Sequence, residues 1–162
     1  MKKYLKIALV LFLIIISYFF YSRFKSISEI PSFEYNTLDN EIYSNKSIEK
    51  SNKRTVFVYF SCKCDDCKEL INDIENYKKI LHNNKIILIT TEKNKDVIEN
   101  FVNYEKIKQL NIPLLIDGKN NFPSDFSLGI SIDLPKIIVF DENGILINDI
   151  KSLDNPKLLD YK

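Results

Sequence analysis

The sequence predicts an α/β domain built on a mixed sheet, and three observations lead to that class. Two uninterrupted runs of β-branched and aromatic residues, 55–60 and 86–90, are typical of strands buried on both faces. Each run is followed by a segment whose apolar residues recur three and four positions apart, as in a helix packed on a sheet. A hairpin signal at 137–150 adds antiparallel strands to these strand–helix units, so a mixed sheet is expected.

Length and composition are those of a single globular domain with an N-terminal extension. A length of 162 residues is close to the usual size of one domain, and a hydrophobic content of 45% excludes a disordered chain. A formal net charge of +1 gives no indication of a nucleic-acid partner, and three cysteines are too few for a disulfide-rich scaffold. We divide the chain into a membrane anchor or signal at 1–25, a linker at 26–32 and one domain at 33–162.

The N-terminal segment predicts a transmembrane helix. Residues 7–21 carry no charge and would form a helix of roughly 22 Å at about 1.5 Å per residue. A hydrocarbon core of about 30 Å requires more, but Lys6 can snorkel so that the span extends over 4–21. A cleaved signal peptide is the alternative. Its small-x-small site at 26–28 lies well beyond the apolar run, which favours an uncleaved anchor.

The charges that flank this segment predict its orientation. Lys2, Lys3, Lys6 and the amino terminus outweigh Arg23 and Lys25 on the other side. Because positive charge is retained in the cytoplasm, we expect a single-pass protein of the cell membrane. Its domain would lie on the extracytoplasmic side.

The first half of the domain is predicted from local patterns. Residues 33–38 and 41–43 alternate around Asp39 and Asn40, which indicates a small hairpin before the first buried strand. The helix after that strand has its apolar residues on one face, at Cys67, Leu70, Ile71, Ile74, Tyr77 and Leu81.

The second half repeats strand and helix and ends in a hairpin. Residues 96–107 predict a helix with one apolar face, made by Val97, Ile98, Phe101 and Val102. Gly144 lies in the hairpin turn, where a positive φ is favoured. The other expected elements are short: a strand at 112–116, a helix at 121–128, hairpin strands at 137–140 and 145–150, and a last helix at 155–160.

All three cysteines, Cys62, Cys64 and Cys67, lie between the first buried strand and the helix after it. Cys64 is expected near the helix N-terminus, where unpaired N–H groups and the helix dipole favour a thiolate. Cys67 comes one turn later, faces inward and can close a small disulfide with Cys64. A nucleophilic thiolate with an adjacent resolving thiol is what thiol–disulfide exchange requires. A purely structural disulfide, or two core thiols, is the alternative.

Two stretches resemble the thioredoxin superfamily. Residues 56–67, Val-Phe-Val-Tyr-Phe-Ser-Cys-Lys-Cys-Asp-Asp-Cys, look like the strand and active-site motif of that superfamily. Residues 129–144 are similar to its cis-proline loop, strand and hairpin. The separation of 71 residues between Cys64 and Pro135 exceeds that of thioredoxin by about one βα unit, and residues 113–117 resemble the segment after such an insertion. With the anchor, the chain is most similar to TlpA-like, redoxin-type thiol-disulfide oxidoreductases over roughly 33–150.

The resemblance implies a fold, an activity and a substrate-binding segment. It implies a thioredoxin-like fold with a central mixed sheet flanked by helices, and an oxidoreductase that reduces protein or peptide disulfides without a dissociable cofactor. Pro135 would be cis and would pack against the disulfide, with an ordinary trans proline as the alternative. Leu134 would offer backbone hydrogen bonds to an extended substrate. A transmembrane thiol electron donor is the further partner implied.

Three features depart from the family pattern. No Trp precedes Cys64, no Pro separates the cysteines, and Asn72 lies near the place of the expected helix proline. Asp65 and Asp66 replace the usual residues between the cysteines, and their carboxylates repel a thiolate at Cys64. We expect a reducing couple, because an unstabilised thiolate favours the disulfide form. Lys63 and Lys68 are available to offset the repulsion.

Cys62 is the odd thiol. In an extended segment it would point to the same side as Cys64, two residues later. It is then a second resolving cysteine, an alternative pairing partner, a bystander, or part of a C-x-C-x-x-C site for Cu(I) or Zn. The last possibility gives the alternative function, a copper-binding or delivery protein. A redox-inert interaction domain is a third class.

Two other chemistries have weaker support. His82 lies 15 residues beyond Cys67, about 22 Å along a continuous helix, so it cannot share a metal with the cysteines. A Sco-like copper site, which needs C-x-x-x-C and a distant His, is therefore disfavoured. A peroxidase is disfavoured because Phe57 stands at the position where peroxiredoxins have Pro, although Ser61 stands three before Cys64 as in that family.

Overall fold

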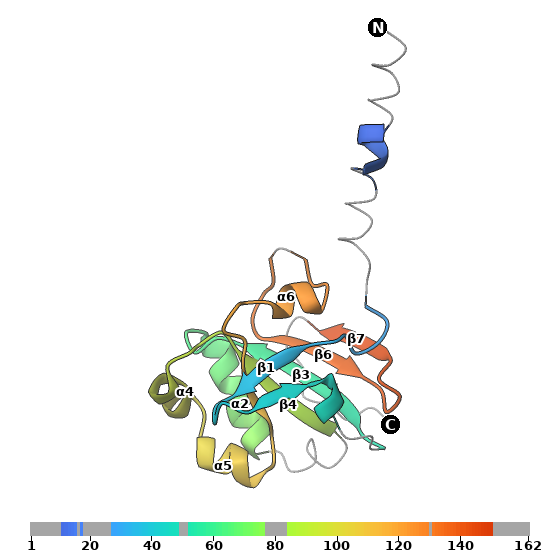
Figure 1. Cartoon of the computed structure of the whole chain (residues 1–162). Helices are drawn as coiled ribbons and strands as arrows, with labels where there is room; N and C mark the ends of the chain where they lie inside the picture. The colour runs from blue at the N-terminus through green and yellow to red at the C-terminus, as the bar shows by residue number, and fades with distance from the viewer. Residues whose placement is uncertain are drawn as a thin grey trace, which may run out of the picture.

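The computed structural model describes residues 11–15, 17, 27–48, 52–76, 84–129 and 131–150 (Figure 1). The predicted anchor at 4–21 lies largely outside these ranges, as do His82 and the predicted helix at 155–160. Within the described ranges, no helix combines the length and apolar character needed to cross a bilayer.

One mixed sheet organises the described part of the domain. Its seven strands follow the order β2-β1-β5-β4-β3-β6-β7. Strand β3 pairs in parallel with β4 and antiparallel with β6, which makes the sheet mixed as predicted. The strands are β1 (Glu34–Thr37), β2 (Ile42–Ser44), β3 (Arg54–Phe60), β4 (Asn84–Thr90), β5 (Leu114–Ile116), β6 (Lys136–Phe140) and β7 (Leu146–Ile150).

The strand directions bring two distant segments to the same edge of the sheet. Strands β3, β4 and β5 are parallel, so their C-terminal ends, Phe60, Thr90 and Ile116, meet at one edge. Strand β6 runs the opposite way, and its first residue, Lys136, pairs with Tyr59. The segment that leads into β6 therefore lies beside the segment that leaves β3.

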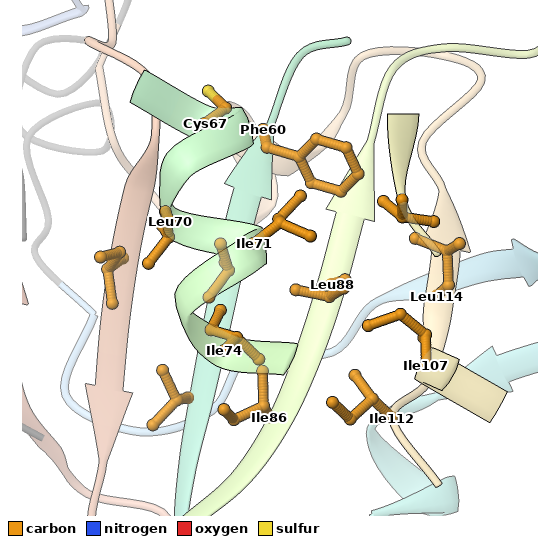
Figure 2. Close-up of a cluster of buried hydrophobic side chains, with 14 of the residues drawn as sticks. Phe60, Cys67, Leu70, Ile71, Ile74, Ile86, Leu88, Ile107, Ile112 and Leu114 are labelled. Carbon is orange, nitrogen blue, oxygen red and sulfur yellow. The ribbon is translucent and has the colours of Figure 1, made fainter. Parts of the chain in front are cut away.

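Helix α2 (Asp65–Asn76) covers one face of the sheet. Figure 2 shows Leu70, Ile71 and Ile74 turned from α2 toward the strands, with Cys67 at the helix end nearest Phe60. Cys67 and Ile71 are fully buried in an aliphatic cluster with Val56, Val58, Ile86 and Leu88. This confirms the predicted apolar spacing as far as Asn76; Tyr77 and Leu81 lie outside the described residues.

The prediction of one helix at 96–107 is wrong. The structure has α4 (Lys95–Phe101) and α5 (Tyr104–Gln109) instead. The break occurs because the side chain of Asn103 accepts a hydrogen bond from Lys106 N–H and so caps a new helix. Its backbone N–H donates to Glu75 on α2. Val97, expected to be buried, is 40% exposed.

The opposite face of the sheet is aromatic. Helix α6 (Phe122–Asp125), shorter than the predicted 121–128, covers this face. Figure 1 shows α6 on the other side of the sheet from α2. The buried rings here come from sheet strands, from the segment before β1 and from α6 and its end: Phe33, Tyr35, Phe57, Tyr59, Phe122, Phe126 and Phe140.

The two predicted hairpins and the strand predicted at 112–116 are present at or near their expected positions. The hairpins of β1–β2 and β6–β7 form, with Asn40 and Gly144 at positive φ in their turns. The end of the linker is attached to the second hairpin: Ile30 N–H donates to the Gly144 carbonyl at 3.0 Å, and Leu146 N–H donates to the Ser28 carbonyl at 2.9 Å. This attachment lies at the sheet edge opposite Phe60, because Phe140 pairs with Thr55 at the start of β3.

Candidate active site

Cys64 occupies the N-terminal end of α2, as predicted. A turn after β3 positions it: Cys64 N–H donates to the Ser61 carbonyl at 3.2 Å, and Lys63 N–H donates to Ser61 Oγ at 3.2 Å. Cys64 then caps the helix, because its Sγ accepts from Cys67 N–H at 3.1 Å and its carbonyl accepts from Lys68 N–H at 3.2 Å. A sulfur held here lies in the positive field of the helix N-terminus, which favours a thiolate.

Cys64 and Cys67 form a disulfide. The Sγ–Sγ distance is 2.20 Å, the χ3 dihedral is 83° and the Cα–Cα distance is 5.2 Å. Cys67 is fully buried in the aliphatic cluster beneath α2, whereas Cys64 is half-buried. An approaching sulfur from another molecule can therefore reach Cys64 but not Cys67. This asymmetry is that of an attacking and a resolving cysteine.

The loop before β6 lies against this disulfide. The Leu134–Pro135 peptide bond is cis, as the resemblance implies, and the Leu134 carbonyl oxygen is 3.7 Å from Cys64 Sγ. Pro135 is buried, and Leu134 packs partly against both core clusters. The structure thus brings together four predicted site residues, Cys64, Cys67, Leu134 and Pro135.

Charges of both signs flank Cys64 along the chain, with Lys63 directly before it and Lys68 four residues later. Asp65, Asp66 and Asp133 are exposed, the first two in the first turn of α2 and the third directly before Leu134. The Lys68 side chain has its partners on α4. Its Nζ donates to the Phe101 carbonyl and lies 4.9 Å from the centroid of the Phe101 ring. An ammonium with these partners keeps its charge, so the offset expected from Lys68 stays a prediction.

Cys62 is a free thiol outside the disulfide pair. Residues 62 and 63 form a turn, so the expectation of an extended segment with Cys62 and Cys64 on one side is wrong. The Cys62 thiol is half-buried and is hydrogen-bonded to the Thr90 side chain at the end of β4. Burial raises the pKa of Cys62, while the Thr90 hydrogen bond and the Lys68 charge act in the opposite direction. Cys62 is a protonated thiol at neutral pH.

In the described structure, Cys62, Cys64 and Cys67 do not form the C-x-C-x-x-C metal site. With Cys64 and Cys67 joined, two of its three sulfurs are not thiolate ligands. Over the described ranges, no three His, Cys, Asp or Glu side chains are grouped to hold a metal ion.

Three residues that contact or adjoin the cysteine motif and the cis-proline loop were not expected from the sequence. Thr90 and Phe101 come from β4 and α4, and Asp133 precedes the cis-proline pair. Thr90 had an available signal, because the ends of neighbouring parallel strands meet at one edge. Asp133 could have been found from its position, two residues before Pro135. The contact of Lys68 with Phe101 depends on the break between α4 and α5, which local spacing did not reveal.

Comparison with known proteins agrees with this geometry. The AhpC/TSA family model matches residues 28–148, which is most of the chain. No curated protein sequence matches the chain.

Three solved structures illustrate the similarity of fold. A secreted Mycobacterium tuberculosis disulfide oxidoreductase homologous to E. coli DsbE is 15% identical, with 79% of this chain and 89% of that chain covered and a TM-score of 0.60. StoA from Bacillus subtilis is 19% identical, with 83% and 98% covered and a TM-score of 0.57. A thiol:disulfide interchange protein of the thioredoxin family from Chlorobium tepidum is 20% identical, with 78% and 86% covered and a TM-score of 0.56. The predicted thioredoxin-like fold is confirmed.

Proposed function

Because the chain belongs to the AhpC/TSA family, we propose that it is a thiol-disulfide oxidoreductase that reduces protein or peptide disulfides. One observation carries the proposal: a half-buried cysteine at a helix N-terminus is joined to a buried one and touched by a cis-proline loop. The similar structures include a disulfide oxidoreductase and a thiol:disulfide interchange protein, which supports the same activity.

The chemistry proceeds by two exchanges. In the reduced protein, the Cys64 thiolate attacks one sulfur of a substrate disulfide, forms a mixed disulfide and releases the other substrate sulfur as a thiolate. The Cys67 thiolate then attacks Cys64 Sγ, re-forms the Cys64–Cys67 disulfide and releases the second substrate thiolate. Two electrons pass to the substrate. A thiol-bearing electron donor in the membrane restores the dithiol.

Leu134 and Pro135 bind the substrate in this proposal. The Leu134 carbonyl oxygen lies 3.7 Å from Cys64 Sγ, so a substrate strand beside Leu134 would carry its own cysteine to that sulfur. Backbone hydrogen bonds to an extended chain do not depend on its sequence. This accounts for a protein or peptide substrate rather than a small molecule.

In this proposal the Cys64–Cys67 dithiol acts as a reductant. The carboxylates of Asp65 and Asp66, in the first turn of α2, repel a thiolate on Cys64. A less stable thiolate makes the dithiol a better electron donor. Replacing both aspartates with Asn would raise the reduction potential.

The domain is anchored to the cell membrane through 4–21, on the extracytoplasmic side, in the same proposal. The uncharged run and its flanking lysines support the anchor. The attachment of Ser28 and Ile30 to the β6–β7 hairpin supports a definite orientation, because that hairpin is at the sheet edge opposite Cys64. The disulfide would then face away from the bilayer and toward substrates in solution.

Substrate trapping tests the activity. A Cys67→Ser variant lacks the resolving sulfur, so it should accumulate mixed disulfides on Cys64 that a reductant releases. The matched Cys64→Ser variant should trap nothing, and the full chain should reduce a peptide disulfide only with both cysteines present. Equal trapping by the two variants, or activity that survives Cys64→Ser, would overturn the proposal. Rapid reduction of hydrogen peroxide by Cys64, with no reaction on disulfides, would identify a peroxidase instead.

A further inference from the structure

We infer that Lys68 and Glu75 are positioning residues for the second exchange of the proposed reaction. They hold α2 against the break between α4 and α5, and so keep Cys67 where it can attack the mixed disulfide on Cys64. This role rests on the proposed function and adds two residues to its chemistry. It is carried by the contacts that link these two side chains and the core to three consecutive residues, 101–103.

Lys68 and Glu75 contact the two helix ends that meet at the break. The Lys68 ammonium donates to the carbonyl of Phe101, the last residue of α4, and lies 4.9 Å from the centroid of its ring. Glu75 follows about two turns later, on the same side of α2, and its Oε1 accepts from the Asn103 backbone N–H at 3.1 Å. Asn103 is the N-cap of α5. Each charge suits the helix end that it contacts, because C-terminal carbonyls and N-terminal N–H groups lack partners within their own helices.

The residue between these two contacts is anchored in the core. Val102 is 1% exposed and belongs to the same aliphatic cluster as Cys67. The Phe101 ring also stacks on the Phe60 ring at the end of β3, with centroids 5.6 Å apart. The break is therefore fixed by the core and the sheet, and α2 is held against it at two points. Two such points set both the rotation of α2 about its axis and its position along that axis.

The position of α2 matters most while the substrate is covalently bound. In the oxidised protein, the Cys64–Cys67 bond holds the two sulfurs together. In the mixed disulfide this bond is absent, so the place of Cys67 Sγ depends on how α2 packs. The apolar side chains beneath α2 supply attraction with little directional preference, whereas hydrogen bonds require a defined geometry. Lys68 directly follows Cys67, so its contact with α4 acts at the turn that carries the attacking sulfur.

The second exchange is the step that requires this placement. The Cys67 thiolate attacks Cys64 Sγ and forms the Cys64–Cys67 bond, while the bond from Cys64 to the substrate breaks and its electron pair leaves with the substrate thiolate. The sulfurs must be nearly in contact and in line, and a misplacement of about 1 Å can slow such a step about 100-fold. The first exchange is less sensitive, because the substrate approaches from solution and Cys64 is held by its own N–H bond to the Ser61 carbonyl.

A single-turnover experiment on the reduced full chain in a non-ionic detergent separates the two exchanges. Every protein carries Cys62→Ser, so that only Cys64 and Cys67 react. The substrate is a peptide whose one cysteine forms a mixed disulfide with 2-thiopyridine. Attack by Cys64 on the peptide sulfur releases thiopyridone, which is followed by absorbance, and the peptide stays on Cys64 until Cys67 displaces it. Acid quenching and mass spectrometry give the lifetime of this adduct.

The double variant Lys68→Met with Glu75→Met removes both contacts without changing the net charge. We expect its adduct to last roughly tenfold longer than that of the parent, through displacement of Cys67 by a fraction of an ångström, while thiopyridone release stays within about twofold. The conservative pair Lys68→Arg with Glu75→Gln keeps a donor for the Phe101 carbonyl and an acceptor for the Asn103 N–H. Its adduct should last about as long as that of the parent.

Lys95→Met with Glu105→Met is the matched control. It removes one cation from α4 and one exposed anion from α5, and Lys95 pairs with Asp39 and Glu99 rather than with α2. Neither rate should change. Urea unfolding of each variant ensures that both exchanges are measured well below its transition.

The three proteins distinguish positioning from general stability. An adduct that is resolved as fast in the double variant as in the parent would overturn the positioning role and leave the oxidoreductase intact. Equal slowing of both exchanges, or an adduct that lasts as long in the conservative pair as in the double variant, would overturn it as well. A parent protein that forms no adduct with the peptide would overturn the proposed function instead.

Discussion

The two faces of the sheet are filled by different side chains. The face under α2 is mainly aliphatic, with Ile, Leu and Val around Cys67 together with the ring of Phe60. The face under α6 is aromatic: the Phe122 and Phe126 rings are 4.2 Å apart, and the Phe57 ring contacts those of Phe33, Phe126 and Phe140. Strand β3 serves both, with Val56 and Val58 on the first face and Phe57 and Tyr59 on the second.

The difference follows from what covers each face. Helix α2 has 12 residues and brings its own Leu and Ile side chains, so medium-sized aliphatic residues on the strands complete the packing. Helix α6 has four residues and few side chains to contribute, so large rings must fill the same depth. The Cys64–Cys67 pair lies on the face under α2. The end of the linker, Ile27 and Ile30, packs on the aromatic face under α6. Both faces therefore contribute to stability, whereas the redox pair belongs to the face under α2 alone.

Loss of an aromatic ring should give the largest effect on stability. Phe57 is fully buried among three other rings, so Phe57→Ala should lower the free energy of unfolding by about 4 kcal/mol. The rate of disulfide exchange per folded molecule should stay within about twofold of the parent. Urea unfolding and a peptide-disulfide assay below the transition measure both. A large loss of exchange rate in folded protein would break the division between the faces.

The matched change on the other face should cost less stability and more activity. Ile71 is fully buried beneath α2, so Ile71→Ala should lower the free energy of unfolding by about 3 kcal/mol. Because α2 also holds both cysteines, the exchange rate of the folded variant should fall more than that of Phe57→Ala. Hydrogen exchange should show the extra loss of protection within α2. Equal activity in the two variants would contradict the comparison.

Strand β3 shows how far the sequence predicts this arrangement. Its uninterrupted run predicted burial on both faces, and its alternation of Val with Phe or Tyr already separates the two cores. The disulfide pair was predictable because strand, C-x-x-C and helix are contiguous. Leu134 and Pro135 were found only through resemblance, since their approach to Cys64 depends on how β6 pairs with β3.

What the sequence did not reveal depends on contacts between distant segments. The apolar spacing continued from α4 into α5, and the break is caused by the Asn103 cap and its hydrogen bond to Glu75 on another helix. The partner of Lys68 depends on that break. The side predicted for Cys62 was wrong because the segment is not extended. The Ser61 side chain accepts a hydrogen bond that closes a turn, and hydrophobic patterning does not reveal such a turn.

Tyrosines on the aromatic face should make the protein sensitive to alkali. Burial, followed by the hydrogen bond to Asp125, raises the pKa of Tyr35, and burial with the nearby Asp117 raises that of Tyr59. A pKa that is higher in the folded state means that the folded protein holds more protons above about pH 10, the ordinary pKa of tyrosine. The contribution of these two tyrosines to the free energy of unfolding should therefore be constant below about pH 10. Above that pH it should fall.

The Tyr35→Phe variant separates the contribution of Tyr35 to this alkaline loss of stability from that of Tyr59. It should cost about 1 kcal/mol at pH 7 through loss of the 2.7 Å hydrogen bond to Asp125, and it should flatten the decline above about pH 10. Urea unfolding between pH 7 and 11 measures both effects. Tyr104→Phe on α5 is the control, because that hydroxyl bonds Asp39 at an exposed position and should change the slope less. An unchanged alkaline slope in Tyr35→Phe would refute the assignment.

The smallest effect on disulfide exchange is expected at Cys62. This thiol packs on the face under α2 but takes no part in the proposed reaction. Burial raises its pKa, so in the oxidised protein iodoacetamide at pH 8 should alkylate Cys62 several-fold more slowly than a free cysteine peptide. The Thr90 hydroxyl lowers that pKa, so Thr90→Val should slow alkylation further and Thr90→Ser should preserve the rate. Cys62→Ser should leave disulfide exchange within about twofold. Fast alkylation together with a large loss of exchange in Cys62→Ser would instead make this thiol a third participant in the reaction.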